Sequence, residues 1–168
     1  MRYADSLLPE FDQEMASTRK VLERVPEDKL DWRAHPKSNT IGWNANHIAE
    51  IPGWAEGVLA HENFDVAPVG GPPYQTPKLA TRAQLLASFD KNVAAARQAI
   101  LNCRDEDVGK TWSLLNGGQP ILTLPRGAAV RGFVMNHLIH HRAILTVYLR
   151  MNDIPVPGMY GPSGDEST

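Results

Sequence analysis

Apolar residues recur every three or four positions in four stretches of this chain, and proline and glycine concentrate in the connections between those stretches. Residues at that spacing lie on one face of an α-helix, so each stretch predicts a helix with one side against a shared core. We expect helices at about residues 5–25, 40–61, 81–103 and 126–152, followed by an extended tail over residues 153–168. The pattern favours an all-α fold, a four-helix bundle with long connecting loops.

Three interruptions of the helical pattern carry information of their own. Pro52 lies inside the second predicted helix and should bend it, because proline has no N–H to donate and its ring crowds the carbonyl four residues back. Residues 62–78 form a long loop rich in proline and glycine, and loops of this length often contribute to a site. Gly117 and Gly118 between two apolar runs predict a small hairpin before the last helix.

Capping residues mark the starts of two of these helices. Thr40 precedes the second helix as its expected N-cap. Thr81 precedes the third, and Gln84 follows it at the spacing of a capping box. The 168 residues suit one domain spanning residues 1–168, and 42% of them are hydrophobic, which is enough for a sizeable core.

Charge and cysteine content exclude several classes of function. Seventeen lysines and arginines against nineteen acidic residues give a net charge of -2, so the chain has no general attraction to nucleic acid or to anionic lipid. No apolar run reaches the roughly 18 residues that a membrane span requires. The single cysteine, Cys103, can form neither an internal disulfide nor a cysteine-rich zinc site. We therefore expect a cytoplasmic protein that binds neither nucleic acid nor membranes.

Two histidines lie in the apolar stripe of the last predicted helix. His137 and His141 are four residues apart, so at about 100° per residue both rings can reach a common point. Val134 and Ile144 continue the same face on either side. A buried imidazole without a partner costs on the order of 1–3 kcal/mol, so each ring must be satisfied. A metal ion does this, because neutral imidazole is a good ligand for zinc, nickel, copper and iron.

A third histidine is expected to join this pair from the second helix. His47 shares a helical stripe with Ile51, Trp54 and Val58, so it too takes a position that an apolar residue would otherwise fill. Three histidines without a buried cysteine match a metal site with three protein ligands, whose remaining positions are open to water or substrate. Such open sites are usually catalytic.

The same residues allow other interpretations, which the sequence leaves open. A core histidine is more often hydrogen-bonded to a neighbour than bound to a metal, and histidine pairs at this spacing also occur by chance. His140 could replace His141 as a ligand or face solvent. Glu50, one turn beyond His47, could orient a ligand or lie on a solvated helix face. Arg142 is expected to form an ion pair rather than to contact substrate.

With these residues in view, the chain resembles the DinB/YfiT-like family of the DinB superfamily over nearly its whole length. The resemblance rests on short motifs that are specific in combination. They are Leu30-Asp31-Trp32-Arg33, His35-Pro36-Lys37-Ser38, Asn46-His47-Ile48-Ala49-Glu50, Asn136-His137-Leu138-Ile139-His140-His141-Arg142 and Val156-Pro157-Gly158-Met159-Tyr160-Gly161-Pro162-Ser163. Many relatives continue the fourth motif with glycine and glutamine, where this chain has Ala143 and Ile144.

The resemblance implies a four-helix bundle, commonly a homodimer, that holds a divalent metal ion through one histidine of the second helix and two of the last. By motif these are His47, His137 and His141, the trio that the helical stripes also select. Relatives include transferases and isomerases that use low-molecular-weight thiols, proteins thought to be hydrolases, and many members without a known activity. The resemblance therefore implies metal binding but does not identify the reaction.

The sequence thus predicts a metal-dependent enzyme that acts on a small-molecule substrate, with zinc or nickel, or alternatively iron(II) or manganese(II), at the three histidines. The ion would polarise an electrophile or lower the pKa of a water or of a low-molecular-weight thiol. The enzyme would be a thiol-dependent transferase or isomerase, or alternatively a hydrolase. Glu50, His140 and Tyr160 are the candidate acid, base or positioning residues. The rival hypothesis is a non-catalytic metal-binding module with a role in stress response or protein interaction.

Overall fold

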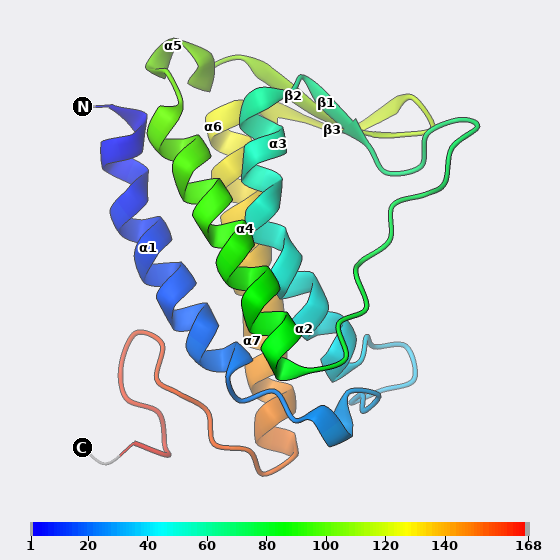
Figure 1. Ribbon diagram of the computed structural model, residues 1–168, viewed down its shortest axis with the longest axis vertical. Helices are drawn as coiled ribbons and strands as arrows, with labels where there is room; N and C mark the ends of the chain where they lie inside the picture. The colour runs from blue at the N-terminus through cyan, green and yellow to red at the C-terminus, as the bar shows by residue number, and fades with distance from the viewer. Residues whose placement is uncertain (1, 167–168) are drawn as a thin grey trace.

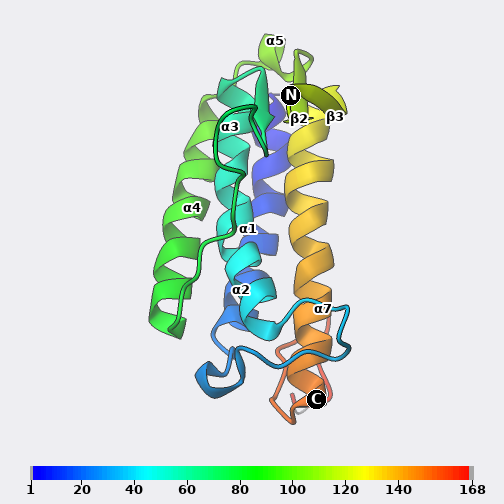
Figure 2. The same cartoon turned by 90° about the vertical axis from the view of Figure 1, so that its right-hand side faces the viewer.

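Long helices lie side by side in the computed structural model, which describes residues 2–166 (Figures 1 and 2). A π-helical segment, η3, joins α6 to α7 without a break, and α2 packs against both α4 and α7. The helices are α1 (Tyr3–Leu22), α2 (Ile41–Glu50), α3 (Trp54–Ala60), α4 (Arg82–Asn102), α5 (Asp105–Val108), α6 (Arg126–Ala129) and α7 (His137–Met151), with η3 at Val130–Asn136 and 3₁₀ segments η1 at Glu27–Lys29 and η2 at Ile51–Gly53.

A three-stranded mixed sheet lies across one end of the helices (Figure 1), so the expected all-α four-helix bundle is wrong. The strands are β1 (Asn63–Asp65), β2 (Thr111–Asn116) and β3 (Gln119–Pro125), in the order β1-β2-β3. The antiparallel pair β2 and β3 is the predicted hairpin. The strand β1 was not expected; it comes from the start of the loop rich in proline and glycine and pairs parallel to β2.

A side chain of β1 also binds the hairpin, and the apolar spacing of the sequence could not have predicted this contact. Asp65, the last residue of β1, accepts hydrogen bonds from the backbone N–H groups of Gly117 (3.1 Å) and Gly118 (2.7 Å) in the hairpin turn. Both glycines have positive φ, 61° and 77°, as a two-residue hairpin turn requires. These contacts join residues about fifty positions apart, and a strand of three residues is too short to show an alternating pattern.

Local sequence signals set the starts of the helices that flank the long loop. The hydroxyl of Thr40 accepts from the backbone N–H of Trp43 (3.1 Å) at the start of α2. At the start of α4 the predicted capping box of Thr81 and Gln84 is present in both directions. Each cap satisfies N–H groups that have no partner within the helix.

The second predicted helix is divided into two at Pro52, where its missing N–H predicted a bend. The helix α2 ends at Glu50, a 3₁₀ turn spans Ile51–Gly53, and α3 begins at Trp54. Asn92 of α4 donates its Nδ2 to the Ala49 carbonyl oxygen (2.8 Å) beside this break. The amide thereby satisfies a backbone acceptor at the point where the helix becomes irregular.

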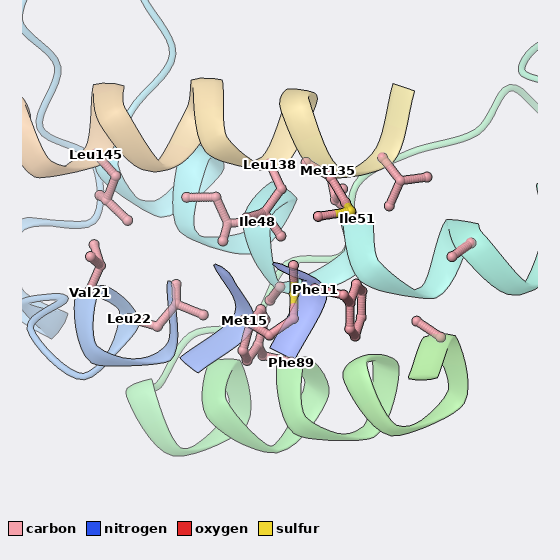
Figure 3. Packing of buried hydrophobic residues seen from close by; sticks show 14 of the residues in the cluster. Phe11, Met15, Val21, Leu22, Ile48, Ile51, Phe89, Met135, Leu138 and Leu145 are labelled. Atoms are coloured by element: carbon pink, nitrogen blue, oxygen red, sulfur yellow. The ribbon is translucent and has the colours of Figure 1, made fainter. Parts of the chain in front are cut away.

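The hydrophobic core fills the space between the long helices (Figure 3). Its largest fully buried side chains come from α1, α2, η2, α4 and the rod formed by η3 and α7. They include Phe11, Leu22, Ile48, Ile51, Phe89, Met135, Leu138 and Leu145. Within residues 2–166 no helix is long and apolar enough to cross a membrane.

Candidate metal centre

Three histidines from two helices bring one ring nitrogen each to a common point. His47 lies in the last turn of α2, and His137 and His141 lie in the first turns of α7. The Nε2 atom of His137 lies 3.4 Å from Nε2 of His47 and 3.0 Å from Nε2 of His141. One ligand nitrogen of each residue falls within 4.8 Å of the others, so the cluster could hold a metal ion.

The second ring nitrogen of two of these histidines is bound by an acceptor. Nδ1 of His47 donates to Glu50 Oε1 (2.6 Å), and Nδ1 of His141 donates to the side-chain oxygen of Asn44 (3.1 Å). The Asn44 amide is oriented by its own Nδ2, which donates to the Thr40 carbonyl oxygen (2.9 Å). Because each Nδ1 carries the proton, the Nε2 atoms of His47 and His141 present lone pairs toward His137.

The spacing of the three nitrogens suits a small divalent cation. Bonds of 2.0–2.1 Å in a tetrahedral arrangement separate two ligand nitrogens by about 3.3 Å. The observed separations of 3.0 and 3.4 Å from His137 bracket that value. The Nε2 atom of His137 lies within hydrogen-bond distance of the other two nitrogens, and a cation between the three would replace those contacts with metal–nitrogen bonds. The donor set therefore fits a metal ion.

The surroundings of His137 and His141 favour the neutral form of each ring, which is the form that binds metals. Burial, followed by repulsion from His47, His137 and His140, lowers the pKa of His141 from 6.5 to about 3. Burial also lowers the pKa of His137, with His47 as the next cause. Neutral imidazole is the ligand form, so neither ring must lose a proton near neutral pH to bind a cation.

Glu50 links the histidine cluster to the long loop. Its carboxylate is buried and accepts hydrogen bonds from His47 Nδ1, from the Thr76 hydroxyl (2.9 Å) and from the Tyr74 hydroxyl. Burial, followed by the hydrogen bond to Glu50, raises the pKa of Tyr74 well above its ordinary value. Sequence reasoning named Glu50 as a candidate but missed Tyr74 and Thr76, for which the only signal was the composition of their loop.

The other two candidate residues lie apart from the histidine nitrogens. His140 is exposed, although its ring centre is 5.0 Å from that of His141. The Tyr160 hydroxyl donates to Glu14 Oε1 (2.9 Å) and accepts from the guanidinium of Arg142 (2.9 Å). Neither His140 nor Tyr160 lines the cavity that adjoins the site. Arg142 forms the expected ion pair, with Glu14 as its partner (2.7 Å).

A cavity of about 1210 Å³ opens beside the histidines. His47 and His137 are part of its wall, together with Glu50. Segments that are far apart in the chain complete the lining: both ends of the loop between β1 and α4, the hairpin, and η3. Its aromatic side chains are those of Trp43, Trp54, Phe64, Tyr74, Trp112 and Phe133. The candidate metal centre therefore has one side open to a space large enough for a small molecule.

Solved structures with the same fold include two DinB-like proteins from bacilli. One, from Bacillus cereus ATCC 10987, aligns with a TM-score of 0.71 and 22% identity over 93% of this chain and 97% of its own. The other, YjoA from Bacillus subtilis, aligns with a TM-score of 0.65 and 15% identity over 89% of this chain and 95% of its own. At these identities the likeness concerns the fold.

Sequence comparison gives a consistent result. The uncharacterized protein YrdA of Bacillus subtilis (strain 168) is 25% identical over 162 residues, which cover 96% of this chain and 90% of that protein. The sequence profile of the DinB superfamily matches residues 10–145, a range that contains all three histidines. This match confirms the resemblance seen in the sequence motifs: the chain belongs to the DinB superfamily.

Proposed function

We propose that this protein is a metal-dependent enzyme that binds a divalent ion, zinc or nickel, through His47, His137 and His141 and acts on a small molecule held in the adjoining cavity. The observation that carries the proposal is the combination of three converging Nε2 atoms with a cavity of about 1210 Å³ at their open side. When bound there, the ion supplies a Lewis acid that activates a thiol or a water as nucleophile.

The chain's own residues have distinct tasks in this proposal. Glu50 fixes the tautomer and the orientation of His47, and Asn44 does the same for His141. The aromatic side chains keep the cavity poor in water, which strengthens electrostatic interactions inside it. Glu50 is also the titratable carboxylate nearest to His47, so it is the group we assign to holding a proton during turnover.

The rival role is a non-catalytic metal-binding module. A closed structural site has four protein ligands. Among residues 2–166 the group of candidate ligands comprises three histidines. A three-ligand site beside a large cavity favours the catalytic role. Thiol transfer and hydrolysis use the same site geometry, and their dependence on an added thiol separates them.

The proposal predicts one equivalent of metal in protein purified without an affinity tag or chelator, measured by elemental analysis. His137→Ala should abolish the metal content, because two histidines alone hold a divalent ion weakly. His140→Ala is the matched control, since it removes an exposed histidine from the same helix, and it should retain the full equivalent. Stoichiometric metal in the His137→Ala variant would contradict the ligand assignment.

The reaction class follows from a second measurement on the metal-loaded protein. A panel of electrophiles and esters is screened with and without a low-molecular-weight thiol. Turnover that requires the thiol identifies a transferase or isomerase, and turnover without it identifies a hydrolase. Full metal occupancy with no turnover in either arm would favour the non-catalytic module.

A further inference from the structure

We infer that the cavity selects a substrate without negative charge that has a flat aromatic portion, which lies against aromatic side chains while a polar end faces the histidines. The position of the polar end rests on the proposed function. The binding of the aromatic portion does not, because it depends only on the cavity wall.

One part of the wall is a continuous aromatic platform assembled from three elements. The rings of Trp54 in α3 and Phe133 in η3 are stacked, with centres 5.3 Å apart and planes inclined by 21°. Trp112 of β2 continues the platform at 5.3 Å from the Phe133 ring. Trp54 also lies 5.5 Å from the ring of His137, so the platform extends to the candidate metal centre.

A second aromatic pair lines the same cavity and leaves apolar surface uncovered. Phe64 of β1 and Tyr74 of the long loop contact each other edge to face, with ring centres 5.6 Å apart. Both residues are well exposed: 46% of the surface of Phe64 and 42% of that of Tyr74 is accessible to solvent. Covering an exposed aromatic ring with another ring removes apolar surface from water and is energetically favourable. A ligand with its own ring therefore fits this wall.

The charged groups of the cavity do not suit an anionic substrate. Within the described chain its lining contains no arginine, and its one lysine, Lys78, is exposed. An arginine fork is the usual means of binding a carboxylate or phosphate. The buried carboxylate of Glu50 is already engaged by His47, Thr76 and Tyr74, and it repels a second negative charge. These features favour a ligand without negative charge.

The cavity also leaves room beside such a ligand. Its volume of about 1210 Å³ exceeds the roughly 300–1,000 Å³ of most small-molecule sites. A bicyclic aromatic molecule therefore leaves space for a second reactant, as transfer to a nucleophile requires.

The test compares two probes that share a ring system and differ in charge: neutral 2-acetylnaphthalene and anionic 2-naphthoate. Calorimetric titration is done first on chelator-treated protein, because a carboxylate can coordinate a metal directly. We expect the neutral probe to bind at least tenfold more tightly than the anion. Equal or reversed affinities would overturn the inference.

Substitutions in the cavity wall test whether the probe binds there. Phe64→Ala and the similar-sized substitution Phe133→Leu should each weaken binding of 2-acetylnaphthalene at least fivefold. Ile121→Ala is the control, because Ile121 is exposed on β3 and lies outside the cavity lining. Circular dichroism checks that each variant is folded. If both Phe64→Ala and Phe133→Leu, folded, retain the original affinity, the inference is wrong.

The two proposals can fail separately. If the protein binds 2-acetylnaphthalene with the expected preference but takes up no metal through the three histidines, the aromatic selectivity stands and the proposed metal enzyme fails. If metal binds as proposed but the neutral probe has no preference or no affinity, the proposed function stands and the substrate class is wrong.

Discussion

At the scale of single residues, the candidate centre depends on the groups behind the histidines. The inner ring nitrogens of the three histidines lie within hydrogen-bond distance of one another. Here Glu50 and Asn44 occupy the outer nitrogens of His47 and His141, so the inner nitrogens are left as acceptors. Such outer partners set the orientation of the ring and raise its basicity as a ligand.

Replacing Glu50 should therefore weaken the metal site without removing a ligand. Glu50→Gln keeps the size of the side chain but removes the negative charge that holds the His47 Nδ1 proton. We expect zinc affinity to fall about 10–100-fold, measured by competition with a chromophoric chelator. Glu56→Gln, on the exposed side of α3, serves as the control and should leave the affinity unchanged. An unaltered affinity in Glu50→Gln would show that this carboxylate has no part in the site.

The depressed pKa of His141 predicts a pH dependence of stability in the metal-free protein. The folded-state pKa of His141 is about 3, against the ordinary value of 6.5 for a solvent-exposed imidazole, as in the unfolded chain. Between these values the unfolded chain binds a proton that the folded chain excludes, so the free energy of unfolding falls as the pH is lowered below about 6.5. Above that pH this residue contributes no slope.

Urea unfolding at pH 7.5, 6.5 and 5.5 with a chelator present measures this slope. The His141→Asn variant should show a shallower decline than the parent protein, whereas His140→Asn, exposed on the same helix, should show the parent slope. Identical slopes in all three proteins would mean that the burial of His141 does not control acid stability.

At the scale of elements, a buried ion pair joins the first and last long helices and the tail. Arg142 of α7 pairs with Glu14 of α1, and both side chains are almost fully buried. The same guanidinium donates to the Thr18 hydroxyl (3.1 Å) and to Tyr160 in the tail. Sequence reasoning predicted an ion pair for Arg142, but its partner lies 128 residues away and could not be named from a local pattern.

Removing one member of this pair leaves a buried charge without compensation. Arg142→Gln should lower the free energy of unfolding by about 3–5 kcal/mol, measured by urea denaturation of the metal-free protein. Arg131→Gln removes a surface ion pair with Glu10 and should cost no more than about 1 kcal/mol. A loss in Arg142→Gln as small as that of the control would indicate that the carboxylate takes up a proton or reaches solvent when its partner is gone.

The last helical rod also contains an element that the apolar spacing did not indicate. Residues Val130–Asn136 are π-helical, and His137 follows directly. A π-helical turn widens the helix and is frequent at functional sites. The buried residues Val130 and Val134 are four positions apart. This spacing fits an α-helix and a π-helix about equally well, so the apolar pattern does not distinguish them.

At the scale of the whole molecule, the cavity exists because segments with no local relation meet. The segment between β1 and α4 passes along the outside of α2 and α3 (Figure 2), and it brings Tyr74 and Thr76 to Glu50. The sheet adds Phe64 and Trp112 to the same wall. The length and composition of the loop suggested a role in a site, but the residues that it contributes became apparent only in three dimensions.

The amino-acid sequence by itself determined the positions of the long helices, the caps at Thr40 and Thr81, the break at Pro52 and the helix faces that carry the histidines. These features depend on interactions within a few residues, which spacing and residue type reveal. Only the tertiary structure decided the pairing of β1 with β2, the acceptors behind the histidines and the meeting of their nitrogens. Those contacts join distant residues, and the free energy that selects them comes from packing the whole chain rather than from any local preference.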